Sequence, residues 1–341
     1  MMKMGRKNNK KQLISYEDAI KKSNDFSMAK LSHKLTLNQM QLLAYMIYST
    51  QKDKKTEFIK ADFEKKFNLG EYRREEAKND TRKLFDLEFS LDNLETDEFD
   101  YLHVFQRISY KKGLFTFKWA EDLLPHIDNL QDRYIVNGFM TIASFKSSFS
   151  WILYDYLKGL YGHWHKPISK EALMRLFSVE DKKTYQSNTG RFKKTVLDVA
   201  IEEINKYTEL EVWYKEEREG RAIVGFDLHW STGEKIENAT KKQIKEIKGV
   251  IEIVFDDMFE YVNIAEKNDR QQAIELIREF ESMREFTEEP ICITKEKADD
   301  LIKKSVWNFR ILNQLLEKNN RALSQDTVKK VKFYNWLEDR D

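Results

Sequence analysis

The sequence predicts a helix-rich α+β fold, with two tandem winged helix-turn-helix domains followed by an all-α C-terminal region. At two places, near residue 102 and near residue 210, the spacing of apolar residues changes from that of a helix to the two-residue period of a β-hairpin. After residue 232 only helical spacings follow. We therefore divide the 341 residues into a flexible basic arm (1–22), a first winged-helix domain (23–143), a second winged-helix domain (144–232) and a helical C-terminal region (233–341).

The composition is that of a soluble globular protein with a heavily charged surface, since 41% of the residues are hydrophobic and 34% are charged. The formal net charge is only +1, but residues 1–230 hold 39 Lys and Arg against 35 Asp and Glu, whereas residues 231–341 hold 20 against 23. A basic front of this kind suits a nucleic-acid partner. The single cysteine, Cys292, excludes an intrachain disulfide, and no apolar run is long enough for a membrane span, so we expect a cytoplasmic protein without membrane contact.

The first 22 residues contain seven Lys or Arg and two acidic residues. Because few of them are apolar, we expect a flexible arm, which either lies along DNA phosphates or acts as a solubilising tail.

The first domain is expected to contain three helices and a wing. Thr36 and Gln39 form a capping box ahead of the first helix. The second helix runs from about Ala61 to Phe67, and the third from about Glu75 to Phe89. Alternating apolar residues from Leu102 to Trp119 then predict a hairpin, which is the wing.

The second domain repeats this order. Ser144 is expected to cap its first helix, Pro167 to begin the second, and Thr189 to cap the third, after which a hairpin follows. At an offset of about 110 residues, apolar positions of the two domains coincide. The pairs are Leu42 with Ile152, Leu43 with Leu153, Ile47 with Leu157, Phe63 with Leu173, and Phe67 with Phe177.

Basic side chains gather at the start of the third helix of the second domain, where a helix that enters a DNA groove places its contacts. We expect Arg191 to read a base edge, because a guanidinium bridges O6 and N7 of guanine, and Lys193 and Lys194 to contact phosphates. A phosphate contact is the alternative for Arg191, and a solvated helix surface would explain the same residues without DNA. The other candidate contacts lie before this helix, in its wing and on the third helix of the first domain: Lys182, Lys183, Thr184, Tyr185, Ser187, Asn188, Thr189, Lys215, Arg218, Arg221, Lys78, Arg82 and Lys83.

Acidic residues lie between these cations in two places, where they would repel a DNA backbone or form an ordinary salt-bridged surface. They are Glu216, Glu217 and Glu219 in the wing, and Glu75, Glu76 and Asp80 in the third helix of the first domain.

One pattern is typical of catalysis: His163-Trp164-His165 matches the His-hydrophobic-His pair of rolling-circle nicking enzymes. It lies in a predicted loop between two helices, where we expect no strand to align both rings, so a turn that packs Trp164 is the simpler interpretation. A Walker phosphate loop is absent, and the carboxylates are expected on helix surfaces without a histidine partner or a metal-ligand spacing. We therefore predict a non-enzymatic protein with no catalytic residue, cofactor or metal.

Two segments carry a resemblance to a known family. Lys22-Ser23-Asn24 leading into LTLNQMQLLAYMIY, and GRFKKTVLDVAIEEINKYTELEVWY followed by GRAIVGFDLHW, resemble the iteron-binding plasmid replication initiators, which have two tandem winged helices. The similarity covers roughly residues 13 to 230, and the C-terminal portion is similar to the helical extension of initiators from Gram-positive theta-replicating plasmids.

The resemblance implies a protein that binds direct repeats in double-stranded DNA at a plasmid origin, opens an adjacent AT-rich segment with host replication proteins, and represses its own gene. It also implies a homodimer in the repressor form, and a second winged helix that dominates repeat recognition through Arg191, Lys193 and Lys194. Two alternatives stay open. They are a two-winged-helix transcriptional repressor without origin function, and a metal-dependent nicking enzyme that uses His163 and His165.

Overall fold

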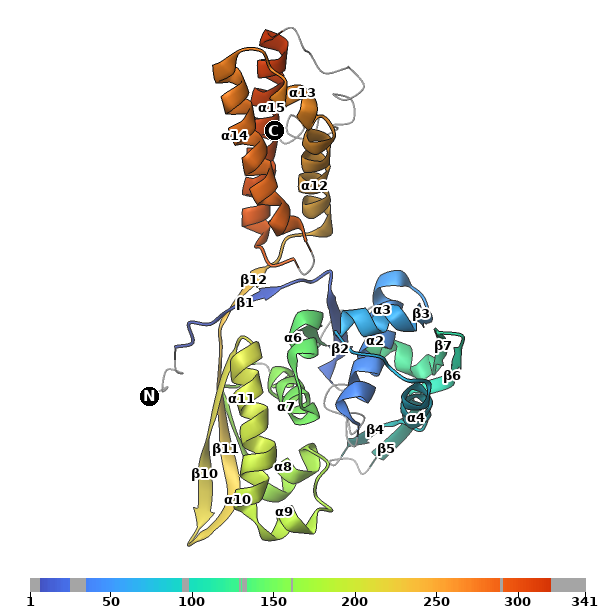
Figure 1. The fold of residues 1–341 in the computed structure, drawn as a ribbon. Coiled ribbons are helices and arrows are strands. Elements are labelled where there is room, and N and C mark those ends of the chain that lie inside the picture. The colour runs from blue at the N-terminus through green and yellow to red at the C-terminus, as the bar shows by residue number, and fades with distance from the viewer. Residues whose placement is uncertain are drawn as a thin grey trace. The chain divides into compact units, whose positions relative to one another are not determined.

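The computed structural model describes residues 7–24, 35–93, 98–128, 130, 134–160, 162–288 and 291–319. The chain divides into two compact units, one of residues 1–12 and 18–235 and the other of residues 13–17 and 236–341. Both winged helices belong to the first unit, and the C-terminal helices form the second (Figure 1). Within the described ranges, no helix has both the length and the apolar character needed to cross a membrane.

The first winged helix contains the expected elements and one additional hairpin. They are α2 (Leu37–Asp53), β3 (Glu57–Ile59), α3 (Lys60–Lys66), α4 (Arg74–Phe85), β4 (Glu88–Asn93), β5 (Glu98–His103), β6 (Phe105–Lys111) and β7 (Leu114–Trp119). The capping box is confirmed, since the Thr36 hydroxyl accepts from the backbone N–H of Gln39 at 3.3 Å. The third helix ends at Phe85 and not at Phe89, because the chain from Glu88 pairs with β5. Leu102 belongs to this extra hairpin and not to the wing.

The second winged helix follows the same order. Its elements are α7 (Ser148–Gly159), β9 (His165–Ser169), α8 (Lys170–Leu176), α9 (Lys183–Ser187), α10 (Thr189–Phe192), a π-helical turn (Lys193–Leu197), α11 (Asp198–Tyr207), β10 (Leu210–Glu219) and β11 (Ala222–Thr232). Ser147 caps the first helix, because Ser144 still belongs to the preceding α6 (Phe139–Ser144). Pro167 lies within strand β9, and the Ser169 hydroxyl caps α8 by accepting from Ala172 N at 3.1 Å.

The predicted internal repeat is confirmed at the level of topology. The strand orders are β3-β7-β6 and β10-β11-β9, so in each domain the strand before the second helix pairs with the second strand of the wing. Helices α3 and α8 begin at Lys60 and Lys170, which matches the offset of about 110 residues. All ten apolar residues that this offset pairs are at most 6% exposed.

The segment that joins the two winged helices consists of a 3-10 turn (Glu121–Leu123), α5 (Leu124–Ile127), β8 (Tyr134–Gly138) and α6. Pro125 stands in the first turn of α5, where its missing N–H costs no intrahelical hydrogen bond. Strand β8 pairs antiparallel with β2 (Ala19–Ser23).

The prediction of a flexible N-terminal arm is wrong for residues 7–22. Besides β2, residues Lys11–Ile14 form β1, which pairs with β12 (Glu234–Glu237). The amide of Asn8 donates to the carbonyl oxygens of Glu209 at 2.7 Å and Ser231 at 2.9 Å. Backbone pairing therefore orders a segment with few apolar residues. Strand structure also continues past residue 232, where the sequence indicated only helices.

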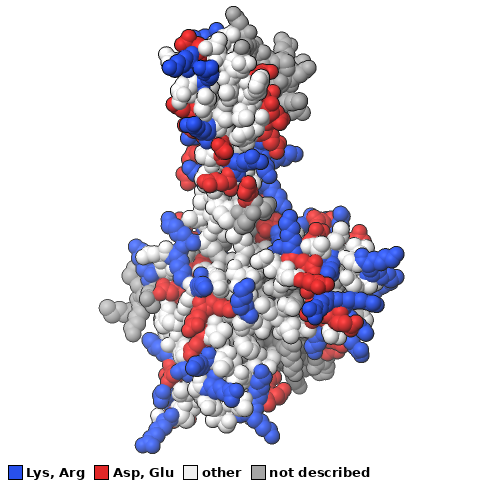
Figure 2. All heavy atoms as spheres, in the orientation of Figure 1, with Lys and Arg blue, Asp and Glu red and all other residues white. Residues whose placement is uncertain are grey.

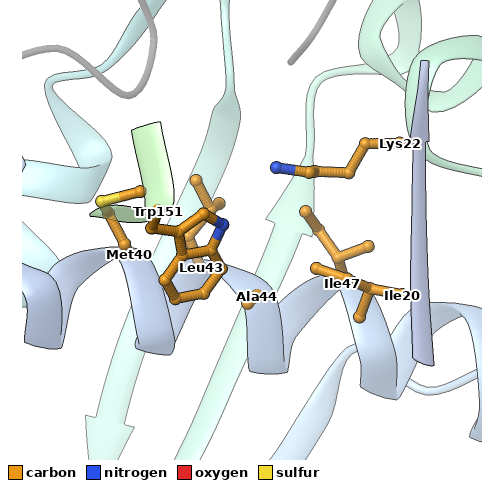
Figure 3. Close-up of a pocket in the computed structure, with 7 residues that line it drawn as sticks. All are labelled: Ile20, Lys22, Met40, Leu43, Ala44, Ile47 and Trp151. Atoms are coloured by element: carbon orange, nitrogen blue, oxygen red, sulfur yellow. The ribbon is translucent and has the colours of Figure 1, made fainter. Parts of the chain in front are cut away.

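One hydrophobic core runs through both winged helices, and a buried polar network lies where they meet. Lys22 of β2 forms an ion pair with Asp155 of α7 at 2.5 Å, and Asn137 of β8 donates to the same carboxylate at 2.6 Å. An apolar cavity of about 20 Å³ lies beside Lys22 (Figure 3). A space of this size holds about one water molecule, so it belongs to the packing and is no ligand site. It is lined by Ile20, Lys22, Met40, Leu43, Ala44, Ile47 and Trp151.

The described part of the C-terminal unit is helical, with a core of its own. Its helices are α12 (Lys241–Asp256), α13 (Met258–Val262), α14 (Lys267–Arg284), a 3-10 turn (Glu285–Thr287) and α15 (Lys295–Lys318). A capping box of Thr240 and Gln243 begins α12. The apolar spacing of Val328, Val331, Trp336 and Leu337 predicts one more short helix, but these residues lie outside the described part of the chain.

Candidate nucleic-acid interface

The recognition helix of the second winged helix is built from α10, the π-helical turn and α11. Its N-cap is Asn188 and not Thr189, because the Asn188 side-chain oxygen accepts from the backbone N–H of Arg191 at 2.9 Å. Phe192, Val196 and Leu197 are fully buried and fix the first turns to the core. The start of the helix is therefore rigidly held while its polar face stays in solvent.

Most of the predicted contact residues of this domain lie on the surface, at the end of the first unit that carries α9, α10 and the tip of the β10–β11 hairpin. Figure 2 shows basic side chains gathered over this end, with acidic ones between them. Tyr185, Thr189 and Lys193 are half-buried. The exposed ones are Lys182, Lys183, Thr184, Ser187, Asn188, Arg191, Lys194, Lys215, Arg218 and Arg221.

Helix α9 packs against the recognition helix through Tyr185. The ring of Tyr185 lies 6.1 Å from the ring of Phe192, and its hydroxyl accepts from Thr195 at 3.2 Å. The amino group of Lys182 lies 5.4 Å from the centre of the same ring. Buried Lys170 donates to the Gln186 carbonyl at 2.7 Å, which holds the end of α9. These contacts give the approach to the recognition helix one fixed geometry.

The wing residue Glu216 forms ion pairs with two of the cations that we predicted to bind DNA. One carboxylate oxygen of Glu216 is ion-paired with Lys193, and the other accepts from Arg218 Nε at 3.0 Å. The hydrogen bond between the two groups raises the pKa of Lys193 and lowers the pKa of Glu216. Their side chains are only 24% and 21% exposed. Glu216 is therefore the neutralising partner of these cations and not a free acid that repels DNA.

The sequence reasoning missed this pairing, although the strand period contained a signal for it. Tyr214 and Glu216 are two residues apart on β10 and so lie on one face of the sheet. The Tyr214 ring lies 5.6 Å from the Lys193 amino group, and its hydroxyl donates to Asp198 at 2.8 Å. In contrast, Arg191 and Lys194 have no ion-pair partner among the described residues, which leaves both charges available to a ligand.

In the first domain, helix α4 presents Lys78, Arg82 and Lys83, all exposed. Asp80, which we expected on the same surface, is 8% exposed and accepts from Gln39 at 2.9 Å and from the Tyr72 hydroxyl at 2.6 Å. Burial and this hydrogen bond raise the pKa of Tyr72 far above its usual range.

The Glu76 carboxylate also has a partner inside the domain, since it accepts a hydrogen bond from the backbone N–H of Arg73, the N-cap of α4, at 2.8 Å. Two of the three acids that were expected to offset this basic surface are thus used inside the domain. The surface of α4 is more basic than its sequence indicates.

The prediction that no strand reaches the His163-Trp164-His165 segment is wrong, because β9 begins at His165 and pairs with β11. The structure does not bring His163 and His165 together as a pair of ligands. Instead, His165 lies beside Asp227 and His229 of β11. The expectation that no carboxylate has a histidine partner is therefore also wrong, because strand pairing unites residues that are more than 60 positions apart.

Two family models match the chain. Residues 19–158 match the model described as "Initiator Replication protein, WH1", and residues 169–230 match the model described as "Initiator Rep protein, WH2". A search of curated proteins finds no match. Among solved structures, the chain is similar to the crystal structure of Pi initiator protein in complex with iteron DNA. The TM-score is 0.52 at 20% sequence identity, over 65% of this chain and 100% of that chain. At this identity the likeness shows the fold alone.

Proposed function

From the premise that the chain belongs to the initiator replication protein family, whose WH1 and WH2 models it matches, we propose that it binds direct repeats at the replication origin of a plasmid. The Pi initiator protein, which shares the fold over its whole solved chain, was crystallised in complex with iteron DNA. The observation that carries the proposal is the start of the second recognition helix. There, exposed Arg191 and Lys194, with no ion-pair partner among the described residues, stand on a firmly packed helix.

We assign distinct roles to the cations of this interface. Arg191 reads a guanine edge, because its planar guanidinium donates two parallel hydrogen bonds. Lys194, Lys182 and Lys183 contact phosphates, which orient the protein on the duplex without reading its sequence. In the first domain, the exposed cations of α4 contact a second stretch of backbone. Together the two winged helices gather affinity that a chain of net charge +1 would otherwise lack.

In this proposal, the free energy of binding to the repeats drives the opening of the origin. Several copies on spaced repeats bend the duplex and lower the cost of melting a flexible AT-rich neighbour, which host replication proteins then occupy. A homodimer bound at the upstream DNA of the gene represses its transcription. The Gram-positive theta type, suggested by the helical C-terminal region, belongs to the same proposal.

A footprint on the DNA upstream of the gene tests the binding step. We expect protection of direct repeats whose spacing is a whole number of turns of about 10.5 bp, beside an AT-rich tract. A plasmid that carries the gene and this DNA should replicate when the protein is supplied. Protection of the repeats without replication of the plasmid would favour a transcriptional repressor. A covalent protein–DNA adduct on supercoiled DNA would favour a nicking enzyme instead.

A further inference from the structure

Three side chains with metal-ligating atoms meet on the sheet of the second wing. His165 lies on β9, and Asp227 and His229 lie two residues apart on β11, so strand pairing places all three on one face. One ligand atom from each lies within 4.8 Å of the other two. Asp227 bridges the pair, with one oxygen 3.0 Å from His165 Nδ1 and the other 2.7 Å from His229 Nε2. The sheet face opposite to the buried core thus carries a two-histidine, one-carboxylate cluster.

The packing of the cluster holds both imidazole rings in place. Trp213 and His165 are the cross-strand neighbours of His229 on its two sides. The rings of Trp213 and His229 stack at 5.5 Å and 9°, and those of His165 and His229 at 5.5 Å and 18°. Trp164 packs beside the cluster, with its ring 4.2 Å from that of His165 and 5.7 Å from that of His229. Rings that are fixed in this way lose little further freedom when they bind a ligand.

His229 shows that the cluster is incomplete. The residue is 5% exposed, yet its Nε2 makes no hydrogen bond with any described residue. The 2.7 Å contact between His229 Nε2 and Asp227 does not have the geometry of a hydrogen bond. An unsatisfied buried nitrogen is costly, and an unprotonated imidazole nitrogen and a carboxylate oxygen this close repel each other unless both bind the same cation.

We propose that His165, Asp227 and His229 bind a divalent transition-metal ion, with Zn²⁺ as the expected occupant. Two neutral imidazoles and a carboxylate are ligands that zinc accepts, and they leave one tetrahedral position for water. Zinc–ligand bonds of about 2.0–2.2 Å place neighbouring ligand atoms about 3.3 Å apart. Small rotations of the three side chains therefore suffice. The His165 side chain is 39% exposed and gives the ion a path from solvent.

The ion would join strand β9 to β11 at the base of the wing. Because β9 is only five residues long, a bond from His165 to a metal shared with β11 stabilises this short strand. The site is a property of the fold of the second winged helix, so it stands whether or not the chain initiates replication.

Titration of the metal-free full chain with Co²⁺, a spectroscopic substitute for Zn²⁺, tests the proposal. We expect one saturable equivalent with visible ligand-field absorption, displaced by Zn²⁺, and a rise in melting temperature on adding Zn²⁺. His165→Ala, at a half-exposed position that leaves the core intact, should lose the absorption and the rise in melting temperature, as should Asp227→Asn. The matched control is His163→Ala, an exposed histidine two residues away that should retain both signals.

Circular dichroism of each variant establishes that it is folded before the titration is compared. The proposal is overturned if the wild-type chain binds no saturable equivalent of Co²⁺. It is also overturned if folded His165→Ala binds Co²⁺ as tightly as the wild type, or if His163→Ala loses the signal to the same extent. In that case Asp227 serves only as the hydrogen-bond partner of His165.

Discussion

Replacing Glu216 by Gln should strengthen the binding of DNA, because this carboxylate neutralises Lys193 and Arg218 in the free protein. The amide keeps the size of the side chain and removes its charge. Both cations are then available to phosphates at the edge of the recognition helix and wing. The cost to folding is small, about 1 kcal/mol or less, since the paired side chains are partly exposed.

The size of the effect follows from counterion release. Each new phosphate contact adds about 0.9 to the magnitude of the slope of log K against log salt, and at about 0.15 M salt this corresponds to roughly a fivefold gain in affinity. One freed cation that reaches DNA therefore gives about fivefold, and two give about 25-fold. Because phosphate contacts are independent of sequence, the gain should be equal on repeat and random DNA, so selectivity should not improve.

Fluorescence anisotropy titrations at several salt concentrations measure both quantities. Glu219→Gln is the matched control, because it removes the same charge near the tip of the hairpin from a residue with no ion-pair partner among those described. We expect the control to change affinity less than twofold and to leave the slope unaltered. Equal slopes for Glu216→Gln and the wild type, or equal changes in the two variants, would refute the reasoning.

Three further predictions concern the interface and the core. Arg191→Ala should cost about 1–3 kcal/mol on the repeat and relax selectivity, whereas Lys194→Ala should weaken repeat and random DNA alike and flatten the salt slope; titrations on both DNAs separate the two roles. Desolvation lowers the pKa of Lys158 to about 8 from its usual 10.5. The folded chain therefore loses this proton first, and stability should rise by about 2 kcal/mol between about pH 7.5 and 9.5 in urea unfolding, a rise that Lys158→Met should abolish. Asp155→Ala leaves buried Lys22 without its partner and should destabilise the first unit by about 3–5 kcal/mol, while loss of both charges in the double variant with Lys22→Met should cost less.

The repeated order of helices and wings could be predicted from sequence because the spacing of apolar residues depends only on neighbouring positions in the chain. Phe63 and Leu173 stand at matching positions of short helices, and both are fully buried. The sequence was less informative where two local structures suit the same residues. Glu88 continues a plausible helix, but pairing with a strand ten residues further along determines its structure. Thr189 and Asn188 are both good caps, and only the backbone geometry of the preceding α9 decides between them.

The parts of the site that the sequence did not predict depend on partners far away along the chain. Asn8 binds backbone oxygens more than 200 positions away, so composition alone wrongly indicated a flexible arm. Lys193 and Glu216 are 23 positions apart and meet because the wing folds back on its helix. The cluster around His229 needs the register between two strands, which no spacing within either strand reveals.

The single core shared by the two winged helices has a consequence for the DNA that such a protein selects. Since Lys22 and Asp155 fasten the domains across a packed boundary, the two recognition helices cannot adjust their separation independently. If both winged helices contact one repeat, as proposed above, the distance between the two contacts is therefore fixed. Two base pairs inserted within one repeat would rotate one half of the site by about a fifth of a turn around the duplex axis. A flexible linker would absorb that rotation, but a fused body would have to release one of its two contacts.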